Sequence, residues 1–176
     1  MPGFWAQRRN LNLLGVLACA GALGFAFFSQ YVLGYQPCHL CIFQRVGVLA
    51  MGIAFLLAAV HDPGPAGARS YAGLIGLATL VTMATAGRHV WIQLQPPGSV
   101  PGCGADLDFM LDVFPLYEVV LKVFQAGGEC AAVDISFLGL SFPAWVLVFA
   151  VLVGAAGLWI NLRSNPQLAS DSISRS

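Results

Sequence analysis

Four long apolar stretches, separated by polar segments, dominate the pattern of hydrophobic positions along this chain. A helix needs about 20 consecutive, mainly apolar residues to cross the hydrocarbon core of a bilayer. All four stretches come close to or exceed that length. The pattern therefore predicts four membrane-spanning helices, at about residues 11–33, 42–60, 70–88 and 143–162.

Composition agrees with this pattern. Of 176 residues, 58% are hydrophobic and 9% are charged, whereas about 25% are charged in soluble domains. We expect an all-α integral membrane protein in which residues 1–165 form one four-helix domain. Residues 89–142 form its long loop, and residues 166–176 form a polar, serine-rich tail that we expect to be disordered. The first apolar run is too long for a signal peptide, so we expect it to remain as the first helix.

The basic residues predict how the bundle is oriented. Loops on the cytoplasmic side of a membrane protein carry an excess of Lys and Arg. In a four-span arrangement one side holds most of the arginines, namely Arg8, Arg9, Arg69, Arg163 and Arg175. This side is predicted to be cytoplasmic, with both termini, and the loop 89–142 is predicted to face outward. The sequence contains no basic patch of the kind that would indicate binding to nucleic acid.

Four of the five cysteines fall on the predicted outer side, and the fifth, Cys19, lies within the first span. The outer four are Cys38, Cys41, Cys103 and Cys130. Paired cysteines persist as disulfides in oxidising compartments outside the cytosol. The cysteine positions therefore agree with the orientation that the arginines predict. Cys19 is expected to be a small buried apolar residue.

The outer loop is predicted to carry one short helix. Apolar residues recur at helical spacing over 113–124, and Glu118 and Lys122 are placed to pair four residues apart on the other face. This segment is too short to span a bilayer. We expect it to lie along the membrane surface, with packing on the bundle as the alternative.

The Cys38-His39-Leu40-Cys41 motif stands at the outer mouth of the second span. A Cys-x-x-Cys pair can exchange two electrons as a disulfide, and a helix N-terminus or a nearby imidazolium such as that of His39 favours its thiolate. Arg45 follows Cys41 by four residues and so projects from the same face. A charge within a span costs about 2.5–3.5 kcal/mol, so Arg45 needs a partner. The candidates are a thiolate, a polar carrier head group, or water reached by snorkelling.

Two further features add to this motif. Cys103 and Cys130 are separated by 26 residues, and alone they would suggest a structural disulfide worth about 3 kcal/mol. With a second pair on the same side, they can exchange through mixed disulfides. His89 follows the third apolar stretch at the depth of the motif. It is either a group that bonds a carrier carbonyl or moves a proton, or an interfacial histidine bonded to water.

Together these features resemble the DsbB family of bacterial inner-membrane, disulfide-generating enzymes. The resemblance extends from the first to the fourth helix. The matching features are the Cys-x-x-Cys motif followed by Arg45, His89 after the third helix, the Cys103/Cys130 pair, and the segment Phe137-Leu138-Gly139-Leu140 with Pro143 and Trp145.

The resemblance implies an activity. A member of this family is a thiol–disulfide oxidoreductase of the inner membrane. It reoxidises a periplasmic thioredoxin-fold protein of the DsbA type and passes the electrons to ubiquinone or menaquinone, without a metal. Both termini would be cytoplasmic and the redox-active cysteines periplasmic.

The resemblance also implies residue roles. Cys103 would form the mixed disulfide with the DsbA-type protein, with Cys130 as its partner cysteine. Cys38 would exchange with this loop pair, and Cys41 would lie nearest the quinone. The quinone-side residues would be Arg45 and His89.

Three other interpretations are open to the sequence. The vitamin K epoxide reductase family uses similar chemistry, but its carrier-facing pair comes after its loop cysteines, which is the reverse of the order here. A metal or haem protein is the second. Against it, Ile42 stands where a c-type haem motif needs histidine, and zinc would need four converging ligands. A non-catalytic membrane protein with two static disulfides is the third.

Overall fold

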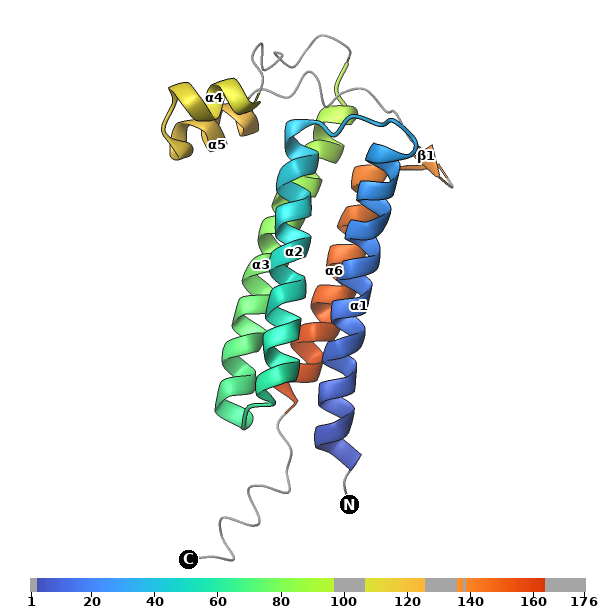
Figure 1. Ribbon diagram of the computed structural model, residues 1–176, viewed down its shortest axis with the longest axis vertical. Helices are drawn as coiled ribbons and strands as arrows, with labels where there is room; N and C mark the ends of the chain where they lie inside the picture. Colours follow the sequence, from blue (N-terminus) through green and yellow to red (C-terminus); the bar gives the residue numbers. More distant parts are fainter. Residues whose placement is uncertain (1–2, 97–106, 126–135, 138, 164–176) are drawn as a thin grey trace, which may run out of the picture.

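The computed structural model describes residues 3–96, 107–125, 136–137 and 139–163. Four long helices run side by side (Figure 1). All four are long and apolar enough to cross a membrane, which confirms the predicted all-α membrane bundle. They are α1 (Gly3–Tyr31), α2 (His39–His61), α3 (Pro65–Gln93) and α6 (Phe142–Leu162). The predicted tail at residues 166–176 lies outside the described residues.

The long helices extend beyond the apolar stretches that predicted them. α2 begins at His39 instead of residue 42, and α3 continues to Gln93 instead of residue 88. Hydropathy locates the part of a helix that suits lipid, whereas the backbone stays helical until a breaker, which for α3 comes only at Pro96. Cys41 therefore lies within the first turn of α2, and His89 lies inside α3 and not after it.

The α2–α3 turn lies at the same end of the bundle as the start of α1 and the end of α6 (Figure 1). Asp62 adopts a left-handed backbone conformation with φ of 37°, and Pro65 starts α3. Arg8 of α1 donates to Asp62 Oδ1 at 3.1 Å and to the carbonyl oxygen of Pro63. This contact joins α1 to the turn at the end opposite the Cys-x-x-Cys motif.

The packing core is centred on Phe55 of α2. Its side chain is fully buried, and glycines of two other helices face its ring. A Cβ atom added at Gly157 of α6 would lie 2.5 Å from Phe55 Cζ, and one at Gly15 of α1 would lie 2.7 Å from Phe55 Cδ1. Small residues allow this close approach of membrane helices. The buried cluster consists of Cys19, Val48, Met51, Ala54, Phe55 and Ile75, so Cys19 is buried as expected.

A buried amide pair joins α1 to α6. Asn161 Nδ2 donates to Asn12 Oδ1 at 2.9 Å and also to the carbonyl oxygen of Gly157, and Asn12 Nδ2 donates back to Asn161 Oδ1 at 3.4 Å. Both side chains are buried. Hydrogen bonds between membrane helices contribute about 0.6 kcal/mol on average and about 1.7 at most.

We expect Asn161→Ala to lower the free energy of unfolding by about 1 kcal/mol, because it removes the interhelical bonds and leaves Asn12 buried without its amide partner. Reversible unfolding in mixed detergent micelles measures this change. Asn10→Ala is the matched control, since Asn10 is an exposed asparagine of α1, two residues before Asn12. Equal effects of the two substitutions would show that the Asn12–Asn161 pair does not stabilise the bundle.

The described part of the outer loop contains two short helices, where the sequence predicted one over 113–124. The second of them covers most of the predicted range, and the first was not predicted. They are α4 (Leu107–Val113) and α5 (Leu116–Gln125). Pro115 separates them, because it has no N–H to donate and its ring disfavours helical backbone at Phe114. The predicted Glu118–Lys122 pair is also replaced: Glu118 accepts from the Tyr117 hydroxyl, and Lys122 Nζ lies 4.3 Å from the centre of the Phe114 ring.

The α4–α5 pair lies at the end of the bundle where α2 begins (Figure 1), and it packs there against α2 and α3. Met110 of α4 and Val119 of α5 form a buried cluster with Leu40 of α2 and Ile92 of α3, and Cys38 packs against it. Packing on the bundle was the alternative that the sequence left open. The other side of the pair exposes apolar side chains, as a helix at a membrane surface would: Phe109, Leu111, Val113, Leu116, Tyr117 and Leu121.

A small hairpin leads into α6. Strands β1 (Ser136–Phe137) and β2 (Leu140–Ser141) pair antiparallel, and Gly139 between them has φ of 80°, which favours glycine.

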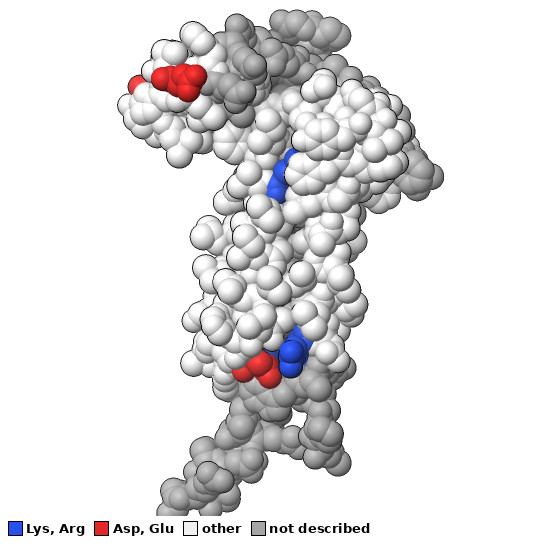
Figure 2. Space-filling model, in the orientation of Figure 1, with Lys and Arg blue, Asp and Glu red and all other residues white. Residues whose placement is uncertain are grey.

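Figure 2 shows one face of the bundle: charged side chains lie at its two ends, apart from a basic side chain in the upper part. The long uncharged surface between the ends suits contact with lipid.

Candidate functional site

The Cys-x-x-Cys motif forms the start of α2. Cys38 caps the helix: its backbone is extended, and its Sγ accepts the backbone N–H of Cys41 at 3.4 Å. The two sulfur atoms lie 3.1 Å apart as thiols. The N–H groups of a first helical turn have no partner within the helix and create a positive field. This end of the helix therefore favours negative charge.

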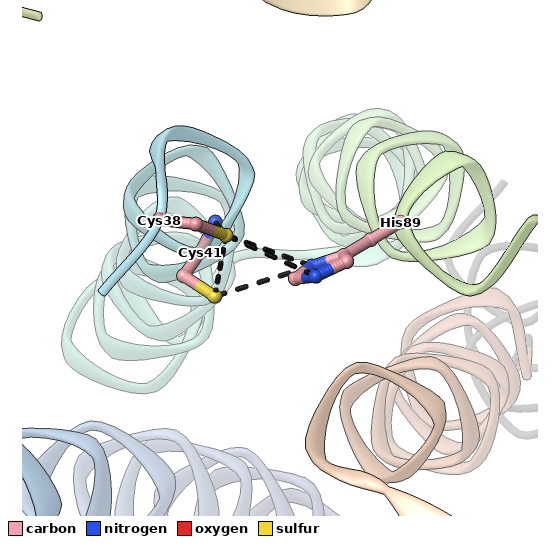
Figure 3. Close-up of side chains that lie close together, drawn as sticks. All are labelled: Cys38, Cys41 and His89. Atoms are coloured by element: carbon pink, nitrogen blue, oxygen red, sulfur yellow. Dashed lines mark hydrogen bonds between the residues drawn. The ribbon is translucent and has the colours of Figure 1, made fainter. Parts of the chain in front are cut away.

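His89 of α3 faces the two cysteines across the helix pair (Figure 3). Its Nε2 lies 3.8 Å and its Nδ1 lies 4.0 Å from Cys38 Sγ, and Nδ1 lies 3.9 Å from Cys41 Sγ. The side chain is 3% exposed, so it is buried between helices and is not the water-bonded interfacial histidine that the sequence left open. The structure thus brings together three of the residues that the sequence singled out.

Gln44 is a further member of this cluster, which we did not identify from the sequence. Its Nε2 lies 3.1 Å from His89 Nδ1, and its side chain is 3% exposed. A signal was present: an amide inside an apolar span, three residues after Cys41, where a helix places neighbouring side chains. Burying an amide without a partner is costly, so such a position suggests a specific hydrogen bond.

Arg45 finds its partners on α1. Its guanidinium donates to Gln30 Oε1 and, at 3.0 Å, to the carbonyl oxygen of Ala26, and it lies 5.2 Å from the centre of the Phe27 ring. From the sequence we expected a thiolate, a carrier head group or water. Gln30 is a second polar residue that we missed, although it too lies inside an apolar span. A role for Arg45 beside a quinone stays a prediction.

The remaining predicted residues divide into two groups. His39 is 8% exposed in the first turn of α2, and its influence on the thiols stays a prediction. Cys103 and Cys130 lie outside the described residues, so their exchange with Cys38 also stays a prediction. The helix that follows Cys103 in the chain, α4, and the helix that precedes Cys130, α5, pack in the cluster that includes Cys38.

The described cluster has the groups needed for dithiol oxidation. Two thiols at this separation become a disulfide when two electrons and two protons leave, and an adjacent imidazole can hold one proton. The sulfur and nitrogen atoms of Cys38, Cys41 and His89 lie within 4.8 Å of one another. A closed structural zinc site has four ligands, one more than this group provides.

Four apolar spans and a dithiol–imidazole cluster at the mouth of two of them define a multi-pass membrane protein with a thiol-based site. The family "Disulfide bond formation protein DsbB" matches residues 8–160, and the chain belongs to this family. The resemblance that the motifs indicated is therefore confirmed, and with it a role in disulfide formation.

Curated relatives named "Disulfide bond formation protein B" are similar along most of their length. The relative from Chromobacterium violaceum is 49% identical over 90% of this chain and 95% of its own. The relative from Nitrosococcus oceani is 48% identical over 86% of this chain and 89% of its own. The relative from Acinetobacter baumannii is 45% identical over 90% of this chain and 93% of its own.

Proposed function

We propose that this protein reoxidises a periplasmic dithiol protein of the DsbA type and transfers the electrons to a membrane quinone. The observation that carries the proposal is the Cys38–Cys41–His89 cluster, which lies where α2 and α3 leave the apolar part of the bundle. In this position a dithiol is accessible both to a protein in the periplasm and to a carrier dissolved in lipid. Membership of the DsbB family supports the same activity.

Electrons would move through two cysteine pairs in the proposed sequence. A thiolate of the reduced partner attacks the Cys103–Cys130 disulfide, forms a mixed disulfide with Cys103, and leaves as an oxidised protein when its second thiolate attacks. The reduced loop pair then reduces the Cys38–Cys41 disulfide by the same exchange. Each exchange moves two electrons, and the protons of the partner's two thiols end on the Cys38 and Cys41 thiols.

The donor groups at the site fit a quinone, which is apolar except for its carbonyl and other oxygen atoms. Arg45 supplies N–H groups inside an otherwise apolar span and would hold a carbonyl, and the buried His89 would lie beside the quinone. A bound quinone would accept the two electrons and two protons that return Cys38 and Cys41 to the disulfide. His89, within 4.0 Å of both sulfur atoms, is placed to move one of these protons.

A strong final acceptor is required by the energetics. A DsbA-type disulfide has a reduction potential of about −120 mV, and each 30 mV of mismatch in a two-electron transfer costs about 1.4 kcal/mol. The disulfide of an ordinary dithiol protein would therefore have difficulty in oxidising such a partner.

We place the protein in the bacterial inner membrane, with both termini in the cytoplasm and the cysteine pairs in the periplasm, as the arginine distribution predicts.

The proposal predicts quinone reduction by the purified protein without oxygen when a reduced DsbA-type protein is added. Ubiquinone and menaquinone analogues are tested separately, and their absorbance is followed. Cys103→Ser should block turnover with the protein dithiol, whereas a small dithiol that reacts directly with Cys38–Cys41 should still support it. Cys19→Ser is the matched control and should retain turnover, because Cys19 is buried in α1.

Three results separate the proposed activity from the two other classes of function. No reduction of either quinone by protein with intact cysteines would contradict the proposal. Stoichiometric zinc in protein purified under reducing conditions would instead favour a metal site. Disulfides that resist mild reductants, together with tolerance of substitution at Arg45, would favour a structural protein with two static disulfides.

A further inference from the structure

The Nδ1 atom of the His89 ring forms a hydrogen bond with Gln44 of α2. Gln44 Nε2 lies 3.1 Å from His89 Nδ1, and both side chains are 3% exposed. An amide nitrogen carries only hydrogens and must donate, so Nδ1 is the acceptor. A neutral imidazole has one N–H, and this hydrogen bond places it on Nε2.

Distance to the sulfur atoms alone would not select this tautomer. Nε2 and Nδ1 lie 3.8 Å and 4.0 Å from Cys38 Sγ, so either nitrogen could carry the proton that faces the sulfur. Gln44 removes this ambiguity because it occupies the lone pair of Nδ1. We propose that Gln44 is a positioning residue that holds His89 as the Nε2–H tautomer and so directs its proton to Cys38.

The consequence is a hydrogen bond that favours the reduced pair in its reactive form. An N–H that donates to a sulfur stabilises the thiolate relative to the thiol. The helix N-terminus already acts on the same sulfur, so Gln44 adds a second, directional contribution through His89. This effect on electron transfer rests on the proposed function, whereas the tautomer itself does not.

The tautomer can be measured by ¹⁵N NMR of the full-length reduced protein in detergent, labelled at its three histidines. The signal that disappears in His89→Asn identifies the ring. In the unsubstituted protein we expect a protonated Nε2 and an unprotonated Nδ1. Gln44→Glu should protonate Nδ1, because a carboxylate only accepts. Gln44→Met keeps the size of the side chain without its polar atoms and should give a mixture of tautomers.

Gln95→Met is the matched control, because Gln95 lies beyond the end of α3 and its amide donates to the carbonyl oxygen of Trp91. It should leave the His89 signals unchanged. Alkylation of Cys38 in the reduced protein should be about three- to tenfold slower in Gln44→Met than in Gln95→Met. If the role of Gln44 were purely structural, Gln44→Met would leave the His89 ring signals unchanged, and Cys38 would be alkylated at the same rate in Gln44→Met and Gln95→Met.

Two results would overturn the inference. One is a protonated Nδ1 in the unsubstituted neutral ring, and the other is an Nε2–H signal that persists unchanged in both Gln44 variants. Neither depends on turnover. A protein that shows the expected tautomer but reduces no quinone would overturn the proposed function and leave the assignment of the tautomer intact.

Discussion

Replacing Cys41 with serine should abolish the proposed quinone reduction, lowering the rate by at least about a thousandfold with both a protein dithiol and a small dithiol. The Sγ atoms of Cys38 and Cys41 lie 3.1 Å apart. A serine hydroxyl in place of the Cys41 thiol cannot form a disulfide with Cys38. The electrons then have no route from Cys38 to the acceptor. This loss differs from that in Cys103→Ser, which a small dithiol should bypass.

The serine variant should also trap an intermediate. Without Cys41, a mixed disulfide between Cys38 and a loop cysteine cannot be resolved by its neighbour, so it should accumulate. Peptide mass spectrometry under non-reducing conditions identifies the linked residues. Cys19→Ser is again the matched control and should show full turnover and no such link. Turnover in Cys41→Ser above a few per cent would mean that the Cys38–Cys41 pair is not the route to the quinone.

The sequence was informative where one physical property dominates. Long apolar runs have few stable solutions in a membrane, so the four spans followed directly from hydropathy. Cysteine spacing and the depth of His89 likewise indicated that Cys38, Cys41 and His89 would lie together, as they do in the structure. In each case a single property, hydropathy or chain position, was enough.

Contacts between helices were harder to predict, because they depend on how each helix is rotated. Arg45 could reach a thiolate, a head group or water, and only the placement of α1 shows that Gln30 and Ala26 bind it. Gln44 was missed for the same reason: its partner lies on α3. The start of the outer helix was placed too early because apolar periodicity continues across Pro115, although the hydrogen bonds of the helix do not.

The polar residues that sequence reasoning missed have a common feature. Gln30, Gln44, Asn12 and Asn161 are amides inside apolar spans, and each has a hydrogen-bond partner on another helix. In lipid such a group must find its partner within the protein. An amide in a span therefore marks a helix–helix contact, and when its partner is a candidate site residue, as for Gln44 and His89, it points to the candidate functional site.

Phe55→Ala should destabilise the bundle far more than a substitution at an exposed apolar position of α2. Its ring fills the space between Gly15 of α1 and Gly157 of α6, and neither glycine has a side chain that could fill the cavity. In the core of a water-soluble protein, Phe→Ala would lower the free energy of unfolding by about 3–5 kcal/mol. Part of this is the free energy of transferring the ring from water to the core. Between membrane helices that part is small, because lipid is as apolar as the core.

The cavity term should therefore set the size of the effect. A residual cavity of about 100 Å³ at about 24 cal/mol per Å³ gives about 2 kcal/mol. Reversible unfolding in mixed micelles measures it. Leu56→Ala is the matched control, because Leu56 is the next residue of α2 and is 43% exposed, and its loss should cost under about 0.5 kcal/mol. Similar losses for both variants would show that Phe55 does not hold α1, α2 and α6 together, and thus that the position of Cys38 and Cys41 does not depend on this contact.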